Sequence, residues 1–393
     1  MCKYQIPYGR QLITEDDIEE VVATLQADFL TQGPKISEFE SNFAKYVDAK
    51  YAVAVSNGTA ALHLALIAMG IKKGDNVITS PITFAATANA ALYVGANVYF
   101  ADINSDTYVI DCQSVEKVIK QHPKGFFKAI LPVDFAGYPI NTQAIKALAD
   151  ANNLLILEDA CHAPGAFFLD SKGIKQKTGN GVYTHATAFS FHPVKHIAAG
   201  EGGMVTTNDE EIYEKLLMLR THGISKENMQ YQILDKEKQG GWYYEMHELG
   251  FNYRITDIQA ALGNSQLKKA DKGMQRRQEI AQNYRNVFAD LPIKMQKEDR
   301  NHFNAHHLFV IEVDNRKELY NFLRENGIFA RIHYIPVHLL DYYTRFGWRK
   351  GDFPNAEKYY EGTISLPMFP SLTTDEQNFV IKKITTFVTR TFL

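Results

Sequence analysis

Between residues 50 and 220, short apolar runs alternate with segments of helical length, and this alternation constrains the fold more than any other feature of the sequence. The expected strands are Ala52–Val55, Val77–Thr79, Asn97–Ala101, Ala129–Val133, Leu154–Leu157, Ala186–Phe191 and Met204–Thr207. The expected helices between them include Ala60–Met69, Ala85–Tyr93, Thr142–Ala151 and Glu210–Arg220. Such alternation predicts an α/β fold with a mostly parallel sheet that helices cover on both faces.

A second, smaller unit follows this alternation. Thr256 and Gln259 have the spacing of a capping box and open a long helix that we expect to continue through the charged stretch Lys268–Arg277. The later elements are a strand at His307–Val313, a helix at Lys317–Asn326, a strand at Ile328–Tyr334 and a last helix from Thr373 or Thr374, where Thr374 and Gln377 repeat the capping-box spacing. The sequence therefore predicts a large domain at 1–265 and a small α+β domain at 266–393.

Composition and charge exclude several classes of protein. The 42 basic and 45 acidic residues leave a net charge of −3 with no block of like charge, which argues against a nucleic-acid binder. Two long uncharged stretches, Tyr51–Ile71 and Asn76–Ala101, contain polar groups that are costly in lipid, so we assign them to a protein core and expect no membrane contact. The three cysteines (Cys2, Cys112 and Cys161) are far apart, without a CxxC pair, which suits a reducing cytoplasm.

The segment Ser56-Asn-Gly-Thr-Ala-Ala-Leu joins a buried strand directly to an apolar helix. The free N–H groups at a helix N-terminus bind anions, Gly58 permits close backbone approach and Thr59 adds a hydroxyl, so the segment predicts a phosphate seat. It lacks the lysine of a P-loop and the GxGxxG pattern. An ordinary strand–helix turn with a capping residue is the alternative reading.

Two acids close the apolar run Leu154–Leu157. Glu158 and Asp159 point to opposite faces if the strand continues, so only one of them can face a ligand at the carboxyl end of the sheet. Asp159 could pair with a protonated ring nitrogen, as a pyridoxal phosphate ring requires, and His162 could reach the same site. The alternative is an acid that caps the next helix.

A lysine emerges after the next apolar strand, in Ser190-Phe-His-Pro-Val-Lys, and a Gly-Glu-Gly-Gly turn follows. Apolar surroundings lower the pKa of a lysine and favour Schiff-base chemistry, so Lys195 is a candidate nucleophile and Ser190 a second phosphate hydroxyl. Alone, the segment also fits a surface lysine in a loop. The order of a phosphate turn, an acid at a strand end and then a lysine favours the chemical interpretation.

At this point the sequence resembles the DegT/DnrJ/StrS family of pyridoxal-phosphate (PLP) sugar aminotransferases, which have the aspartate-aminotransferase (type I) fold. The matching stretches are Leu30-Thr-Gln-Gly-Pro-Lys, Ser56-Asn-Gly-Thr-Ala-Ala-Leu, Glu158-Asp-Ala-Cys-His-Ala, Ser190-Phe-His-Pro-Val-Lys, Gly200-Glu-Gly-Gly, Asn252-Tyr-Arg-Ile-Thr-Asp-Ile-Gln-Ala-Ala-Leu-Gly, His333-Tyr-Ile-Pro and Ser365-Leu-Pro.

The resemblance implies a role for each matching position of the cofactor site. It makes Lys195 the Schiff-base lysine, Asp159 the partner of the pyridine nitrogen and His162 a contact of the phenolic oxygen. Further cofactor contacts implied by the family pattern are Gly58, Thr59 and Ser190 at the phosphate, Phe84 stacked on the ring, and Asn252 at the phosphate of the neighbouring subunit. The last assignment implies a homodimer with shared sites.

Within this family the motifs are most similar to the subgroup that aminates C4 of a UDP-linked 2-acetamido-2,6-dideoxy-4-keto-hexose in pseudaminic acid biosynthesis, with L-glutamate as donor. His162 in place of Gln and the motif His333-Tyr-Ile-Pro are among the pointers. By the same resemblance the sugar nucleotide is expected to contact Tyr8, Asp28, Phe29, Leu30, Thr31, His333, Tyr334, Ile335, Pro336 and Tyr342. Another nucleotide-sugar C4 or C3 aminotransferase is the alternative.

Three alternatives compete with the interpretation as an aminotransferase. A pyridoxamine-dependent sugar dehydratase of this fold carries His where this chain has Lys195. A regulator with a PLP fold usually has an added DNA-binding segment, whereas only about seven residues precede the first family motif. A metal site at His302, His306 and His307 lacks an HExxH pattern, so we expect no metal and assign these histidines to the start of the following strand. Arg220 and His222 match the family without an assignable role.

Overall fold

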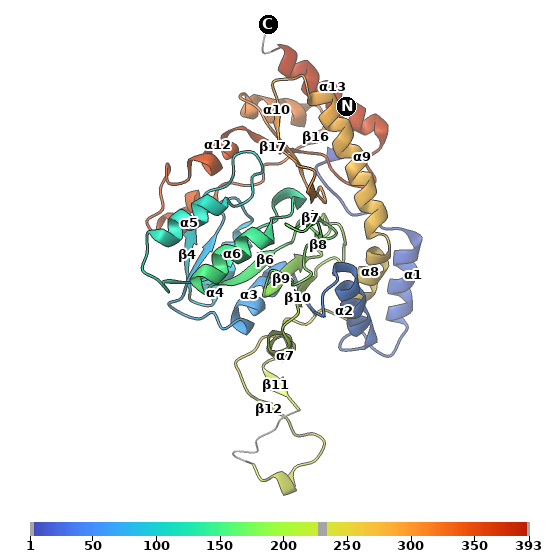
Figure 1. Cartoon of the computed structure of the whole chain (residues 1–393). Helices are drawn as coiled ribbons and strands as arrows, with labels where there is room; N and C mark the ends of the chain where they lie inside the picture. The colour runs from blue at the N-terminus through green and yellow to red at the C-terminus, as the bar shows by residue number, and fades with distance from the viewer. Residues whose placement is uncertain (1–3, 227–233, 391–393) are drawn as a thin grey trace.

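A seven-stranded sheet forms the centre of the computed structural model, which describes residues 4–226 and 234–390 (Figure 1). Its strands are β2 (Tyr51–Val55), β3 (Asn76–Thr79), β4 (Asn97–Phe100), β5 (Phe127–Leu131), β6 (Leu155–Asp159), β9 (Ala186–Ser190) and β10 (Gly203–Thr207), in the order β2-β10-β9-β6-β5-β3-β4. β10 is antiparallel to both neighbours and the other pairs are parallel. The prediction of a mostly parallel α/β sheet is confirmed, and each of the seven expected strands lies in this sheet.

Five helices pack on the sheet: α3 (Gly58–Ala68), α4 (Ala85–Tyr93), α5 (Cys112–Lys120), α6 (Thr142–Asn152) and α7 (Glu210–Leu219). α3 contacts α4, α7 and strands β9 and β10, while α5 packs against α6. The sequence of α3 is apolar on nearly every side, and all but two of its residues are buried. A helix without a polar face must lie inside the protein, so α3 is part of the core itself.

Two N-terminal helices, α1 (Glu15–Leu25) and α2 (Pro34–Val47), pack on α8 (Asp257–Lys268). α8 begins at the predicted capping box, in which the Gln259 N–H donates to Thr256 Oγ1 and the Thr256 N–H donates to Gln259 Oε1. The predicted continuous helix is wrong at Lys269, where the backbone leaves helical geometry (ψ 0°) before α9 (Ala270–Phe288) begins.

The C-terminal part has a hydrophobic core of its own. This core contains β13 (Lys294–Met295), β15 (Phe309–Glu312) and β17 (Thr363–Leu366) in one sheet, with α10 (Arg316–Glu325) and α13 (Thr374–Arg390). The buried residues of α12 (Pro354–Gly362) instead join the core of the central sheet. The expected strand at Ile328–Tyr334 is shorter: β16 (Ile328–Phe329) pairs with the N-terminal β1 (Ile6–Pro7), and beyond it Arg331 forms an isolated bridge with Ser365. Ile6 thus belongs to this C-terminal core although it lies at the start of the chain.

The capping box of the last helix is one residue earlier than the spacing predicted. The Thr373 N–H donates to Glu376 Oε2, and the Glu376 N–H donates to Thr373 Oγ1. Gln377, the residue expected in that role, instead donates its side-chain N–H to the Ile280 carbonyl in the interior.

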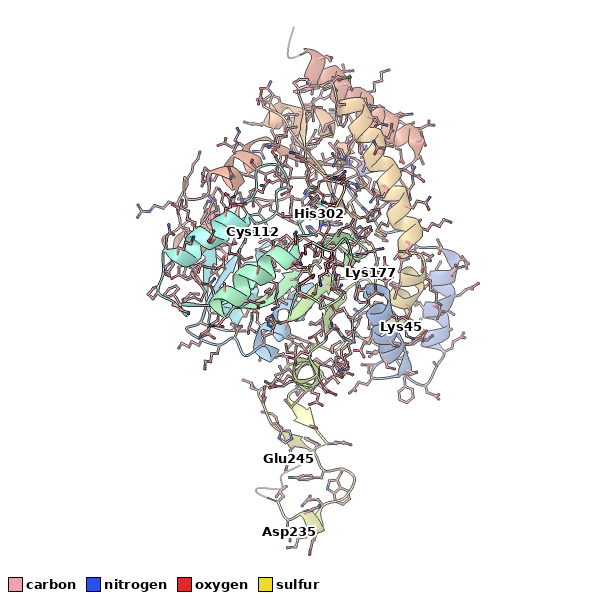
Figure 2. All side chains as sticks on the ribbon, in the orientation of Figure 1. Lys45, Cys112, Lys177, Asp235, Glu245 and His302 are labelled. Atoms are coloured by element: carbon pink, nitrogen blue, oxygen red, sulfur yellow. The ribbon has the colours of Figure 1, made fainter. Side chains whose placement is uncertain are left out.

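The remaining elements are short. A three-stranded sheet joins β7 (Phe167–Leu169), β8 (Lys175–Lys177) and β14 (His302–Phe303), and α11 (Asp341–Thr344) precedes α12. After α7 the chain forms an arm with the paired strands β11 (Ile224–Ser225) and β12 (Glu245–Met246), which projects from the body at the bottom of Figure 1. Asp235 and Glu245 mark this arm in Figure 2.

Within the two described ranges, no helix has the length and apolar character needed to cross a bilayer. Cys112 and Cys161 carry free thiols, whereas Cys2 lies outside the described residues.

Candidate active site

A cavity of about 840 Å³ lies at the carboxyl ends of β6 and β9 and at the N-terminus of α3. It brings together ten of the residues that the sequence proposed for the site: Tyr8, Gly58, Thr59, Phe84, Asp159, His162, Ser190, Lys195, His333 and Tyr334. Their positions span the chain from residue 8 to residue 334, so the fold, and not local sequence, gathers them.

The N-terminus of α3 forms a close-fitting anion seat. The Asn57 side chain caps the helix by accepting from the Ala60 N–H at 2.8 Å, which leaves the first N–H groups and Thr59 facing the cavity beside Ser190. A β-carbon added at Gly58 would lie 2.9 Å from Ser190 Cβ, and one added at Gly203 would lie 2.4 Å from the Asn57 carbonyl oxygen. The two glycines therefore allow β9 and β10 to lie in close contact with the N-terminus of α3.

Asp159 is held in place at the end of β6. Its Oδ2 accepts from Thr87 Oγ1 at 2.6 Å, and its Oδ1 accepts from the Cys161 N–H at 3.1 Å. Glu158, the preceding residue, points to the opposite face, as strand alternation predicts. There its Oε2 accepts from Thr187 Oγ1 at 2.8 Å and from the Gly179 N–H at 3.3 Å. Only Asp159 lines the cavity.

Burial governs the protonation of the acids behind the cavity. Burial raises the pKa of Glu158 to about 7, and burial together with the charge of Glu158 raises the pKa of Asp134 well above its usual value. Asp134 Oδ1 accepts from the Ile140 N–H at 2.8 Å, while its Oδ2 has no hydrogen-bond partner.

The amine of Lys195 lies on the cavity wall, 3.4 Å from His307 Nε2. Burial lowers the pKa of Lys195 to about 8, and the nearby Cys161 and Asp159 only partly oppose this shift. About a tenth of the amine is therefore uncharged at pH 7, far more than for a lysine with the ordinary pKa, and the neutral form is the nucleophile.

His162 is buried in a defined orientation. Its Nδ1 accepts from the Ala136 N–H at 3.2 Å, so Nε2 carries the ring proton and faces the Tyr334 hydroxyl at 3.2 Å. Burial lowers the pKa of His162 well below its usual value, and the positive charge of Lys195 adds to this shift. The ring is therefore neutral and donates a hydrogen bond into the site.

His307 is a site residue that the sequence did not identify. Its ring centroid lies 4.4 Å from that of His162, and burial lowers its pKa well below the usual value. By sequence, His307 is grouped with His302 and His306 at the start of a strand, and a metal site at these three residues is the alternative. His302 instead stacks on Tyr138 and pairs with Asp299, and His306 faces Glu298. No signal in the sequence distinguishes His307 from these neighbours.

Phe84 and Tyr8 form the rim of the cavity. Phe84 precedes α4 and is 61% exposed, with its ring 5.9 Å from that of Tyr334. Tyr8 packs its ring 5.1 Å from the His333 ring, and burial raises its pKa. Both positions leave room for a planar ligand between the rim and the buried acids.

The other expected site residues lie outside this cavity: Asn252, Asp28, Phe29, Leu30, Thr31, Ile335, Pro336 and Tyr342. All of them except Pro336 are exposed within the single chain. Asn252 pairs with Thr221, and the Leu30 carbonyl accepts from the Asp257 N–H at 2.9 Å.

Arg220 and His222 have structural contacts away from the cavity. Arg220 forms a largely buried ion pair with Glu40 and donates to the Ala54 carbonyl oxygen at 2.7 Å, which links α2, β2 and the end of α7. His222 occupies a turn with φ 61°, next to Gly223.

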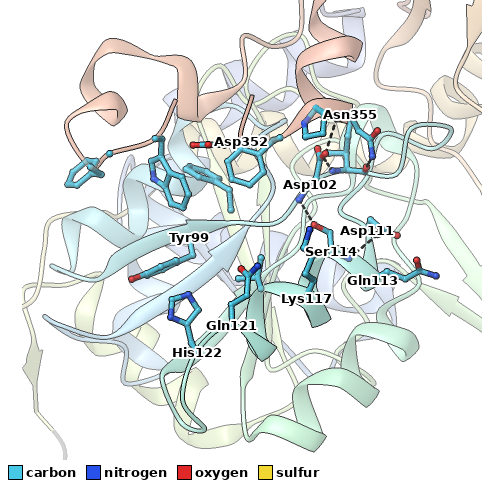
Figure 3. A pocket seen from close by; sticks show the side chains of 18 residues that line it. Tyr99, Asp102, Asp111, Gln113, Ser114, Lys117, Gln121, His122, Asp352 and Asn355 are labelled. Carbon is cyan, nitrogen blue, oxygen red and sulfur yellow. Dashed lines mark hydrogen bonds between the residues drawn. The ribbon is translucent and has the colours of Figure 1, made fainter. Parts of the chain in front are cut away.

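A second hollow, of about 670 Å³, lies between β4, α5 and the segment 346–355 (Figure 3). Asp102 closes its upper wall by accepting from the backbone N–H groups of Asn355 and Ala356. None of the expected site residues lines it.

Comparison with known proteins is consistent with this geometry. The sequence profile of the DegT/DnrJ/EryC1/StrS aminotransferase family matches residues 11–385. The chain belongs to this family. It is 42% identical over 390 residues to the spore coat polysaccharide biosynthesis protein SpsC of Bacillus subtilis, with 96% of each chain covered. It is 35% identical over 382 residues to the UDP-4-amino-4,6-dideoxy-N-acetyl-beta-L-altrosamine transaminase of Campylobacter jejuni, with 95% of each covered.

Solved structures of the family share the fold. Helicobacter pylori PseC, an aminotransferase involved in the biosynthesis of pseudaminic acid, superposes with a TM-score of 0.88 at 30% identity, over 98% of this chain and all of that one. The PLP form of the putative sugar aminotransferase Spr1654 of Streptococcus pneumoniae also gives 0.88, at 28% identity, over 98% of this chain and 99% of that one. The type I aminotransferase fold and the PLP cofactor expected from the sequence are thereby confirmed.

The residues of the cavity fit this cofactor. The helix N-terminus with Gly58 suits a phosphate, the Asp159 carboxylate and the Lys195 amine both line the cavity, and Phe84 offers an exposed ring. The protein is a PLP-dependent sugar aminotransferase.

Proposed function

We propose that the protein transfers the amino group of L-glutamate to C4 of a UDP-linked 4-keto-6-deoxy-N-acetylhexosamine (UDP-2-acetamido-2,6-dideoxy-β-L-arabino-hexos-4-ulose), as a step in pseudaminic acid biosynthesis. The observation that carries the reaction type is the convergence of the Lys195 amine, the Asp159 carboxylate and the α3 seat on one cavity. The likeness to the Campylobacter transaminase and to PseC supports the substrate.

A second candidate stays within the same class. The identity to SpsC, a spore coat polysaccharide protein, exceeds that to the altrosamine transaminase. This observation favours another nucleotide sugar, aminated at C4 or C3, as the alternative substrate.

The cofactor site is assigned residue by residue. Gly58, Thr59 and Ser190 hold the phosphate, Phe84 stacks on the ring, and Asp159 keeps the ring nitrogen protonated. His162 donates its Nε2 proton toward the phenolic oxygen, because its Nδ1 is already used as an acceptor. When bound, PLP acts as an electron sink for the bond that is broken at the amino-acid α-carbon.

Lys195 has two tasks in this scheme. Its neutral amine would form the covalent link that holds the cofactor, and once released its Nζ would carry the proton between the α-carbon of L-glutamate and the cofactor. The pKa of about 8 suits both tasks, because the amine accepts and gives up a proton near neutral pH. In the second half-reaction the same atom would carry the proton in the opposite direction, and the amino group from L-glutamate would pass to the keto carbon of the sugar.

We further propose that two copies of the chain share their sites. Asn252, exposed and outside its own cavity, completes the phosphate seat of the partner. The exposed apolar face of α1, formed by Ile18, Val22 and Leu25 at helical spacing, supports an interface between copies. The exposed segment Asp28, Phe29, Leu30 and Thr31 then faces the sugar nucleotide, together with Tyr8, His333, Tyr334, Ile335, Pro336 and Tyr342.

An absorption spectrum of the purified protein tests the proposal. We expect a yellow band with PLP bound, its loss on addition of L-glutamate, and its return when the UDP-linked 4-keto-sugar is added. Loss without return excludes this sugar and favours the alternative substrate. A protein that never develops the band with added PLP contradicts the reaction itself.

A further inference from the structure

A chain of two hydroxyls leads to the Asp159 carboxylate from the start of α4. Thr83 Oγ1 lies 2.7 Å from Thr87 Oγ1, and Thr87 Oγ1 lies 2.6 Å from Asp159 Oδ2. Thr83 is 2% exposed and Thr87 1%, so water does not compete for these bonds. Neither threonine was singled out by the sequence, because each reads as an ordinary residue near a helix N-terminus.

The direction of the protons follows from the distances. Thr87 has three acceptors within reach: the Asp159 carboxylate at 2.6 Å, Thr83 Oγ1 at 2.7 Å and the Phe84 carbonyl at 3.3 Å. The carboxylate oxygen is the nearest of these acceptors, and 2.6 Å is the usual length of a hydroxyl–carboxylate hydrogen bond. Thr87 therefore donates to Asp159, and Thr83 donates to Thr87.

The other carboxylate oxygen is also occupied, since Asp159 Oδ1 accepts from the Cys161 N–H at 3.1 Å. Two donors on different elements, α4 and the turn after β6, thus fix the plane of the carboxylate. The segment 83–87 also carries Phe84 at the cavity rim. One short stretch of chain therefore positions both the ring-stacking side chain and the acid that faces the ring.

We propose that Thr87, supported by Thr83, is a positioning residue of the transamination, which holds the Asp159 carboxylate oriented toward the ring nitrogen of the cofactor. The inference rests on the proposed role of Asp159 and adds a residue to it. Its chemistry is a hydrogen bond only, so no bond is made or broken at Thr87.

The test compares Thr87→Val, which removes the hydroxyl at nearly constant shape, with Thr87→Ser, which retains it. The readouts are the dissociation constant of PLP, measured from the visible band at equilibrium, and the pH midpoint of that band. We expect Thr87→Val to raise the dissociation constant about tenfold, which equals about 1.4 kcal/mol. The pH midpoint of the band should move upward by about half a unit. A misdirected carboxylate leaves the ring nitrogen less protonated, and the nitrogen linked to Lys195 then becomes more basic.

Thr87→Ser should restore both values to within about twofold and ~0.2 units of the wild type. Thr83→Val should give a smaller change than Thr87→Val, because the direct bond to Asp159 remains. The matched control is Thr79→Val, which removes an equally buried hydroxyl that bonds to the Leu131 carbonyl at 2.7 Å without contacting Asp159. We expect this control to leave the PLP affinity unchanged.

A folded Thr87→Val protein with wild-type PLP affinity and an unchanged midpoint overturns the inference. So does an equal loss in Thr79→Val, which would mark a general packing effect. If Thr87→Val does not fold, the test rests on Thr87→Ser, which retains the hydroxyl. A Thr87→Ser protein whose PLP dissociation constant is raised about tenfold also overturns the inference. Failure of the proposed function is distinguishable, because the wild-type protein would then show no band at all.

Discussion

The amine of Lys195 lies 3.4 Å from Nε2 of His307 in a buried cluster that also contains His162. Burial lowers the pKa of both histidines well below the usual value, so neither ring carries a positive charge near neutral pH. The lysine is thus surrounded by neutral rings, with the Asp159 carboxylate as the anion that faces the same cavity.

The first prediction concerns the pH dependence of cofactor uptake. The neutral amine is the reactive form, and burial lowers the pKa of Lys195 from 10.5 to about 8. The rate at which the cofactor-free protein takes up PLP should therefore rise about tenfold from pH 7 to pH 9 and then level off. Stopped-flow absorbance measures this rate. A rise that continues unbroken toward pH 10.5 would show an unperturbed lysine.

The second prediction concerns the loss of the amine. Lys195→Ala should lower the transamination rate by at least about 10³, because it removes both the covalent link and the proton carrier. The fold should persist, since the side chain makes no hydrogen bond other than that near His307. Coupled detection of 2-oxoglutarate measures the rate, and circular dichroism checks the fold. Activity within tenfold of wild type excludes the assignment.

The third prediction tests whether two chains share a site. Lys195→Ala and Asn252→Asp should each be inactive alone, the second because it places a negative charge beside the phosphate. After mixing, unfolding and refolding, hybrid dimers should regain activity, since one of their two sites then has a native Lys195 and a native partner Asn252. If Asn252 acts within its own subunit, no mixture recovers activity.

The fourth prediction concerns the buried acid behind the sheet. The folded-state pKa of Glu158, about 7, lies above its usual 4.5, so this group contributes stability that is fully present below pH 4.5 and is lost as the pH rises through 7. Glu158→Gln keeps an oxygen acceptor for Thr187 and removes the charge. We expect the variant to be more stable than wild type by ~1–3 kcal/mol at pH 8, with little difference at pH 5. Denaturant unfolding at both pH values measures the difference in stability between the variant and the wild type. An equal difference at pH 5 and at pH 8 would contradict the burial argument.

The fifth prediction concerns Arg220 and Glu40. Arg220→Ala should cost about 3–5 kcal/mol, because it leaves the Glu40 carboxylate buried without its cation. The double variant with Glu40→Ala should lose less than the sum of the two single variants. Unfolding midpoints in denaturant give all four values, and strict additivity would show that the pair does not interact.

The sequence was informative where a long periodic signal exists. All seven strands of the central sheet and the helices α3, α4, α6 and α7 were expected, because buried strands and amphipathic or apolar helices each leave a pattern over many residues, whereas α5 was not named. The pairings of β1 with β16 and of β7 with β14 were not expected. Strands of two or three residues that pair across more than a hundred positions leave no periodic signal.

The site could be predicted to the extent that it follows strand ends and helix starts. Asp159, Ser190, Gly58 and Lys195 stand at such positions and meet in one cavity. Thr87 and His307 could not be found in this way, because their approach to Asp159 and Lys195 depends on how α4 and the segment before β15 pack. Lys269 shows the same limit, since the break between α8 and α9 has no proline or glycine to announce it.

The burial of α3 has a consequence for local unfolding and hydrogen exchange. A helix enclosed by two strands and two other helices has no low-energy opening of its own, so its amide hydrogens should exchange with solvent only when the central sheet unfolds. The segment around the exposed Ile335, which leads away from the cavity residues His333 and Tyr334, lacks such enclosure and should exchange far sooner. The seat on α3 should therefore keep its position while the more exposed parts of the chain around the cavity fluctuate.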